Sequence, residues 1–286
     1  MNIQLKKNNF LRLSKTEFES LAKTELQKPQ VDCPVVHRFG PGIYIREIFV
    51  PAGTFIIGHY HKYAHTNIML KGKATLVMED GTISQLQAPF LYVGTPGRKM
   101  AHVHEDMVWQ NIYATDETDI EKLEEMLLIK GEVWNEHTNL RLRTEKLNQK
   151  INHDDYEAML IDIGYSKESV KEISGNETDQ IPFPMGNYKV MVSASPIEGK
   201  GLFATAFIEP GEIIAPDRID GKRTPAGRFV NHAKSPNARM VILPSGDLDL
   251  VAMKHIFGCQ GGNLGEEITI DYRKALMESQ KYMRNS

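Results

Sequence analysis

The chain has 286 residues, of which 41% are hydrophobic and 25% are charged, and its formal net charge is −3. This composition is typical of a globular protein with a substantial core in one large or two medium domains, and it provides no global basic field for nucleic acid. The two cysteines, Cys33 and Cys259, are too few for a disulfide framework or a four-cysteine zinc site, and they fit a reducing compartment. No apolar run approaches the roughly 20 residues that cross a bilayer. We therefore expect a cytoplasmic protein with no membrane partner and no clear nucleic-acid partner.

The first predicted element is a short helix within an N-terminal helical segment, residues 1–30. Residues 14–17 read Ser-Lys-Thr-Glu, a capping box that marks a helix start, and apolar residues follow at helical spacing until Pro29. From 31 to 115 the sequence changes to short β-prone runs separated by turns that contain Gly and Pro. Strands at such close spacing predict a small β-barrel or sandwich.

Residues 116–184 are expected to form a helical connector and linker. The first predicted helix carries apolar residues at a spacing of three to four: Ile120, Leu123, Met126 and Leu127. Further helical pieces are expected at about 140–149 and 154–163, before a Gly- and Pro-containing linker. Strands and turns return in residues 185–286. The chain is therefore predicted to be mainly β, with an α connector between two β domains.

Three histidines lie in a glycine-framed pattern in the first β region. Gly53 is followed by five residues, His59, one residue, His61, three residues, His65, six residues and Gly72. Because side chains alternate along a strand, the three imidazoles are expected on one face, where they could bind Zn, Fe, Ni or Mn. The spacing resembles the first motif of the cupin superfamily, with His65 where glutamate is usual. The resemblance implies a cupin-like β domain over 31–115.

Cupins carry a fourth ligand, a histidine on a later strand shortly after a Pro-x-Gly turn. Here Pro96-Gly97 precedes His102 and His104, slightly beyond the usual offset. Strand register leaves open whether His102 joins the site or both histidines lie outside it. The candidate ligands of a divalent transition metal are His59, His61, His65 and His102. The alternative is a metal-free cupin domain used for binding or dimerisation, and a homodimer through this domain is expected by analogy.

Three segments near the end of the chain occur in the order of a known enzyme family. Residues 197–204 read Ile-Glu-Gly-Lys-Gly-Leu-Phe-Ala, residues 228–233 read Arg-Phe-Val-Asn-His-Ala, and residues 265–272 read Gly-Glu-Glu-Ile-Thr-Ile-Asp-Tyr. They resemble the three signature motifs of SET-domain protein lysine methyltransferases. The resemblance implies a SET-domain β fold with a pseudoknot in residues 185–286, which include a C-terminal tail.

The sequence departs from the SET pattern at three points. The second motif ends in Ala233 where serine is usual, the insert at 215–227 is short, and no cysteine-rich segment follows Tyr272. Such a minimal domain resembles bacterial and phage versions more than chromatin enzymes.

The SET resemblance implies that S-adenosylmethionine is the cofactor and that the side-chain amine of a protein lysine accepts the methyl group. Tyr272 is then the catalytic residue at the reacting methyl. The residues carried over as cofactor contacts are Lys200, Gly201, Leu202, Phe229, Asn231, His232 and Tyr272. Burial of the substrate amine beside a sulfonium cation disfavours its ammonium form, whose pKa is about 10.4 in free lysine. The enclosing channel supplies a near-attack geometry, so no metal and no strong base are required.

Two other functions remain open on the sequence. One is a non-enzymatic binding or assembly protein, in which the cupin barrel dimerises and the SET domain is a degenerate cofactor-binding or docking module. The other is a cupin metalloenzyme that acts on a small molecule through His59, His61 and His65. Binding of S-adenosylmethionine separates the methyltransferase from the metalloenzyme.

Overall fold

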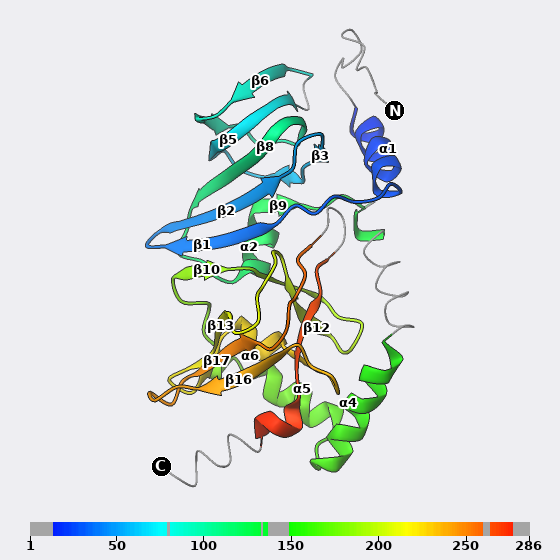
Figure 1. Ribbon diagram of the computed structural model, residues 1–286, viewed down its shortest axis with the longest axis vertical. Coiled ribbons are helices and arrows are strands. Elements are labelled where there is room, and N and C mark those ends of the chain that lie inside the picture. Colours follow the sequence, from blue (N-terminus) through cyan, green and yellow to red (C-terminus); the bar gives the residue numbers. More distant parts are fainter. Residues whose placement is uncertain (1–13, 79–80, 133, 137–148, 260–263, 277–286) are drawn as a thin grey trace.

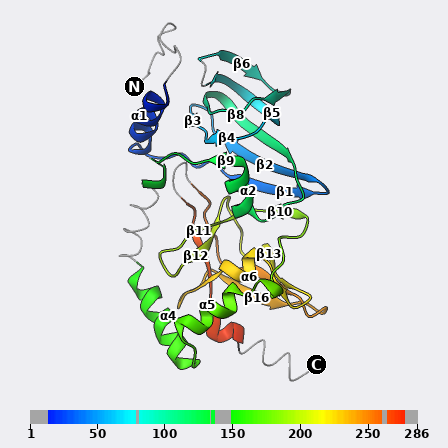
Figure 2. The same ribbon diagram turned by 180° about the vertical axis from the view of Figure 1, so that it is seen from behind.

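The computed structural model describes residues 14–78, 81–132, 134–136, 149–259 and 264–276. Within this part of the chain the protein is mainly β, with few helices. Figures 1 and 2 show a large sheet at one end of the molecule, smaller sheets below it, and two helices at the far end. The first helix, α1 (Lys15–Leu26), begins with the capping box between Ser14 and Glu17. Most of the helical piece expected at 140–149 lies outside the described residues.

The large sheet is antiparallel and has eight strands, in the order β10-β1-β2-β8-β5-β6, with β3 paired to β8 and β7 paired to β5. Its strands are β1 (Val35–Gly40), β2 (Ile43–Val50), β3 (Phe55–Ile57), β5 (His65–Met78), β6 (Ile83–Gln87), β7 (Phe90–Gly94), β8 (Lys99–Ala114) and β10 (Gly186–Tyr188). Buried and less buried residues alternate along β1, as expected for a strand with one face on a core.

Gly72 marks an irregular register between β5 and β8. The pairing of the two strands shifts between Met69 and Ala74, and Gly72 has a positive φ of 97°. A Cβ at this position would lie 2.5 Å from the carbonyl oxygen of Asp106 on the neighbouring strand. Only glycine therefore allows the two backbones to approach so closely here.

The connector supplies helices and short strands. They are α2 (Ile120–Leu127), α4 (Lys150–Asp162), α5 (Lys167–Gly175), the 3₁₀ helix η1 (Glu177–Asp179) and β9 (Leu128–Ile129). Strand β9 pairs with β4 (Tyr60–His61) of the first β region. In α2 three of the expected apolar positions are buried, whereas Met126 is 40% exposed. No helix in the described part of the chain is both long and apolar enough to cross a bilayer.

The C-terminal region contains two four-stranded sheets. One has the order β11 (Val190–Ala194), β12 (Lys200–Ala204), β18 (Glu267–Ile270) and β15 (Asn231–His232). The other has the order β14 (Lys222–Arg223), β13 (Ile213–Ile219), β17 (Leu248–Ala252) and β16 (Ala238–Ile242). The short helix α6 (Pro225–Phe229) leads directly into β15, and residues 272–276 form a helical turn after β18.

The two β regions share one hydrophobic core. Phe39, Tyr44 and Tyr113 from the large sheet belong to the same buried cluster as α2 and the strands of the C-terminal sheets. Phe183 and Tyr188 stack with ring centroids 4.6 Å apart, and β10 places Tyr188 in the large sheet itself. Since buried aromatic pairs contribute strongly to packing, the C-terminal region and the large sheet are held together rather than loosely tethered.

Candidate functional site

Strand β18 brings the three C-terminal segments together. It pairs with β12 through Leu202 and Ile268, and in parallel with β15 through Asn231 and Thr269. Tyr272 follows β18 after one residue and therefore lies beside the second segment. Segments separated by up to seventy residues in sequence thus meet at one place.

Asn231 ties the first segment to the second. Its side-chain nitrogen donates to the carbonyl oxygens of Glu198 and Lys200 at 3.2 and 3.1 Å, and to Glu267 Oε1 at 2.8 Å. A Cβ on Gly201 would collide with the Glu267 carboxylate. The glycine therefore leaves the space in which this carboxylate sits, and Glu267 acts as a structural group that fixes the two segments.

Tyr272 is anchored to the second segment by both its backbone and its hydroxyl. Its hydroxyl donates to the carbonyl oxygen of Val230 at 2.6 Å, and its backbone N–H donates to His232 Nδ1 at 3.1 Å. Burial raises the pKa of Tyr272 far above the ordinary value, with the charges of Tyr156 and Asp217 acting in the same direction. The hydroxyl is therefore a neutral hydrogen-bond donor at physiological pH.

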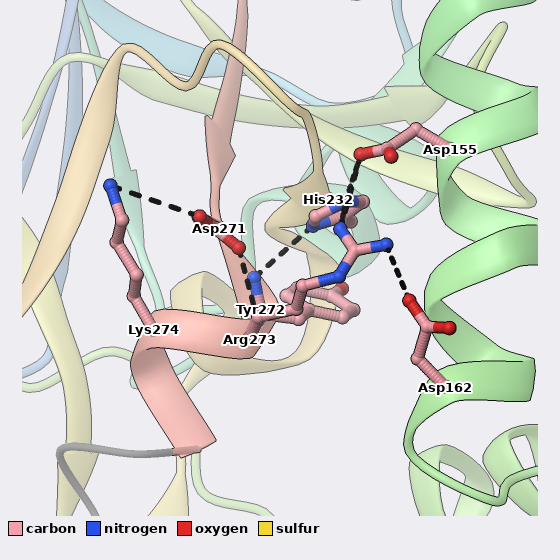
Figure 3. A network of polar contacts seen from close by, with 7 residues as sticks. All are labelled: Asp155, Asp162, His232, Asp271, Tyr272, Arg273 and Lys274. Carbon is pink, nitrogen blue, oxygen red and sulfur yellow. Dashed lines mark hydrogen bonds and ion pairs between the residues drawn. The ribbon is translucent and has the colours of Figure 1, made fainter.

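Helix α4 covers this cluster with an acidic residue. Because His232 Nδ1 accepts a hydrogen bond, its Nε2 carries the proton and donates to Asp155 Oδ2 at 2.8 Å. Arg273 pairs with Asp155 at 3.3 Å and with Asp162 at 3.2 Å (Figure 3). The Tyr156 ring stands edge-on to the Tyr272 ring, with centroids 6.5 Å apart.

Asp155 and Tyr156 were not expected at the site. Burial by itself would raise the pKa of Asp155, but hydrogen bonds from His232 and Arg273 outweigh this effect and lower the pKa. The sequence pattern predicted a helix at 154–163 but gave no sign of a partner 77 residues further along the chain. Only the charged and aromatic residues on the side of α4 that packs inward could have indicated a contact.

The other residues expected to contact the cofactor differ in the burial and the contacts of their side chains. Leu202 is fully buried in the shared core, and Phe229 is half-buried, with the Arg228 guanidinium 4.6 Å from its ring centroid. The Lys200 amine turns away and forms an ion pair with Glu121 of α2. Lys200 therefore presents its main chain, not its side chain, to the Asn231 cluster.

A hollow of about 330 Å³ borders the same cluster. Its walls include Phe203 from the first segment, the preceding Pro196, Phe257, and residues 265–267. It shares Glu267 with the Asn231 network. Ligand pockets usually begin at about 300 Å³, so the hollow is large enough for a small ligand next to the converging motifs.

Only two of the four candidate metal ligands come together, and they lie on separate strands, His61 on β4 and His65 on β5. The His61 and His65 rings stack with centroids 4.4 Å apart. The His59 ring packs edge-on against the Trp134 ring, with centroids 4.9 Å apart, and the His102 ring packs edge-on against the His104 ring, with centroids 4.8 Å apart. On β8, Ala101 and Val103 are buried, so His102 between them points to the opposite face.

The arrangement of these histidines does not fit a transition-metal site. The described residues contain no group of three or more His, Cys, Asp or Glu that could hold a metal ion. His65 Nδ1 must donate to the Tyr63 carbonyl at 3.0 Å, and its Nε2 accepts from Asn111 at 3.2 Å. His61 Nδ1 is bonded to the Tyr113 hydroxyl at 2.5 Å. The expectation of a four-histidine metal site is therefore corrected: side-chain alternation turns His102 away, and hydrogen bonds occupy His65.

The imidazoles of His59, His61 and His65 are neutral, because burial lowers the pKa of each. Burial lowers the pKa of His61 to about 2 and that of His59 to about 3, and nearby positive charges reinforce both shifts. The positive charges that lower the pKa of His61 include those of Lys99 and Arg46.

Comparison with known proteins gives similarity at the level of fold only. No family model matches the chain, and no curated protein matches it. An RmlC-like cupin protein from Methanocaldococcus jannaschii is 18% identical over 31% of this chain and 86% of its own, with a TM-score of 0.26. A cupin domain from Bordetella pertussis is 19% identical over 31% and 97%, with a TM-score of 0.26. A cupin-2 protein from Shewanella frigidimarina is 14% identical over 33% and 91%, with a TM-score of 0.25. These similar structures are cupin-like, and the SET-domain fold stays a prediction.

Proposed function

We propose that the protein transfers a methyl group from S-adenosylmethionine to the side-chain amine of a protein lysine, at the cluster around Tyr272. The observation that carries the proposal is the meeting of three distant segments at this residue. Tyr272 contacts Val230 and His232, and Asn231 contacts Glu198 and Lys200. In chain order these are the segments that resemble the SET motifs.

The chemistry of the cluster suits a cationic cofactor. The Asn231 amide holds three oxygen atoms together: the carbonyl oxygens of Glu198 and Lys200 and the Glu267 carboxylate. The Tyr272 hydroxyl binds a further carbonyl oxygen, that of Val230. Oxygen atoms with partial or full negative charge stabilise a sulfonium and an ammonium group. The main chain of residues 200–202 with Asn231 and His232 would hold the cofactor, whose sulfonium sulfur supplies an activated methyl carbon when bound.

The protein's own residues then have limited tasks. The Tyr272 hydroxyl donates its one proton to the Val230 carbonyl, so its oxygen would accept a hydrogen bond from the lysine N–H and leave the nitrogen lone pair free, while its ring excludes water from one side. Burial of the substrate ammonium at the cluster would lower its pKa and favour release of its proton to solvent. Tyr272 and the surrounding main chain would then hold the neutral nitrogen in line with the methyl carbon that the cofactor would supply. Positioning of the nitrogen is the protein's main contribution to the reaction, so neither Asp271 nor Glu267 is needed as a strong base.

The alternative is a non-enzymatic binding or assembly protein in which the same cluster is only structural. Exposed apolar residues on β7, Leu91 at 62% and Val93 at 68%, support an assembly role for the large sheet, through which we expect a homodimer. The cupin metalloenzyme is not proposed, because the candidate ligands are dispersed.

The proposal is tested by measuring transfer of a labelled methyl group from S-adenosylmethionine to protein. The assay compares Tyr272→Phe with Tyr188→Phe as its matched control. Both substitutions remove one hydroxyl that donates to a backbone carbonyl, of Val230 or Pro184. Tyr272→Phe is expected to reduce transfer at least about a hundredfold, in the range of groups that act at the reacting atoms, while Tyr188→Phe retains it. Equal activity of the two folded variants would assign Tyr272 a structural role only.

A further inference from the structure

Lys99 holds a charge that the rest of the structure does not balance. It is the first residue of β8, and its amine nitrogen is buried and has no hydrogen-bond partner among the described residues. An unpaired ammonium removed from water destabilises a fold by several kcal/mol unless a counter-charge is present. Such a group would be stabilised by an anion beside it.

The amine is directed at the histidine cluster, which we define as His61, His65, Asn67, Asn111 and Tyr113. A Cβ on Gly94 would lie 3.2 Å from Lys99 Nζ and 2.5 Å from Asn67 Nδ2, so both nitrogens lie close to one point above the Gly94 backbone. Gly94 pairs with His65 across β5 and β7. The Lys99 amine and the Asn67 amide nitrogen therefore lie beside each other against the Gly94 backbone.

The charges around the cluster have one sign. Lys99 acts on both His61 and His65, and Arg46 acts on His61 and His59. Arg46 is on β2 opposite Asn111, and its side chain forms no hydrogen bond or ion pair within the described part of the chain. A metal cation would be repelled by this surrounding, whereas an anion would be attracted.

We propose that the inner face of the large sheet is a metal-free anion site, in which Lys99 and the Asn67 amide bind the carboxylate of a small organic acid beside His61. Each amide nitrogen has two N–H groups, and Asn67 uses one of them on the His65 carbonyl. One buried ammonium with neutral donors matches a singly charged carboxylate. A phosphate, with about −1.5 to −2 charges at pH 7, would leave part of its charge uncompensated.

Calorimetric titration with sodium acetate, at ionic strength matched with sodium chloride, tests this site in the full chain. Lys99→Met keeps the length of the side chain and removes its charge, and Lys71→Met at an exposed position of β5 is the matched control. Lys99→Met should weaken acetate binding at least about tenfold, the effect of losing one charge-assisted hydrogen bond. Lys71→Met should bind as the wild type does. In chloride alone, Lys99→Met should melt no lower than the wild type, because it removes an unpaired buried charge.

A second measurement does not depend on a variant that folds. In the wild type, the ¹³Cε resonance of Lys99 should shift on addition of acetate, while that of Lys71 stays fixed. The proposal is overturned by acetate binding that is unchanged in Lys99→Met, by an unshifted Lys99 resonance, or by inorganic phosphate binding in preference to acetate. Stoichiometric binding of zinc or nickel that is lost in His61→Ala would also overturn it.

Discussion

Replacing Asp155 by alanine tests how α4 is held over Tyr272. Asp155 is 16% exposed at its side chain, and its partner His232 is fully buried. The substitution leaves the His232 Nε2–H without its acceptor and removes one of the two carboxylates that pair with Arg273. A hydrogen bond to a charged group contributes about 1.5–3 kcal/mol, and a partly exposed ion pair about 0–1 kcal/mol. We expect Asp155→Ala to lower the free energy of unfolding by about 2–3 kcal/mol.

Urea denaturation followed by circular dichroism measures this difference. Asp162→Ala is the matched control, because Asp162 also pairs with Arg273 from α4 but is 62% exposed. It should lower stability by less than about 1 kcal/mol. Equal losses in the two variants would refute the claim that the buried histidine makes the Asp155 contact strong.

The stability difference between the wild type and Asp155→Ala should depend on pH. The folded-state pKa of Asp155 is lowered, so it lies below the unfolded value of about 3.9. Its contribution is complete above the unfolded pKa and is lost as pH falls through the folded pKa. The difference between wild type and Asp155→Ala should therefore be constant from pH 7 to 5 and shrink below about pH 4. A difference that grows on acidification contradicts this assignment.

Two further predictions concern other parts of the fold. Gly201→Ala places a Cβ against the Glu267 carboxylate and should destabilise the protein by about 1–3 kcal/mol, as overpacking does, whereas Gly40→Ala meets no atom within 4 Å and serves as the control in thermal melts. His37 is buried, and burial, with the Arg46 charge, lowers its pKa to about 3. The unfolded chain therefore binds more protons than the folded protein below about pH 6.5, and stability falls as pH drops through this range. Between pH 6 and 4, His37→Gln should reduce the slope of the unfolding free energy against pH by up to about 1.4 kcal/mol per pH unit. An unchanged slope would show that His37 is protonated in the folded protein.

Local patterns predicted what depends on neighbours in sequence. The capping box at Ser14 and Glu17 precedes α1, and the β-prone runs between 31 and 115 predicted a region of closely spaced strands, as the structure has. The start of the helix and the strands follow from backbone hydrogen bonding and side-chain periodicity, which act over a few residues. That Asn231 and Tyr272 would lie near each other was implied only by the resemblance of the three C-terminal motifs to SET domains.

Contacts between distant segments were not predictable in this way. Nothing in the spacing of α4 indicates that Asp155 meets His232, or that β10 completes the large sheet by pairing with β1. Whether His102 joins the other histidines stayed open for a related reason, since alternation along β8 fixes its face only once the buried neighbours Ala101 and Val103 are known. Lys99 had no sequence signal, because its unpaired amine is visible only when the surrounding strands are in place.

Calorimetric titration of the folded wild-type chain with S-adenosylmethionine tests the central claim most directly. The account predicts binding at one site per chain, weakened in Asn231→Ala, whose side chain holds the segments at Glu198 and Lys200 together. It also predicts unchanged binding in Lys99→Met, because that residue belongs to the separate site in the large sheet. A folded wild type that binds no S-adenosylmethionine would contradict the methyltransferase assignment and leave the binding or assembly alternative.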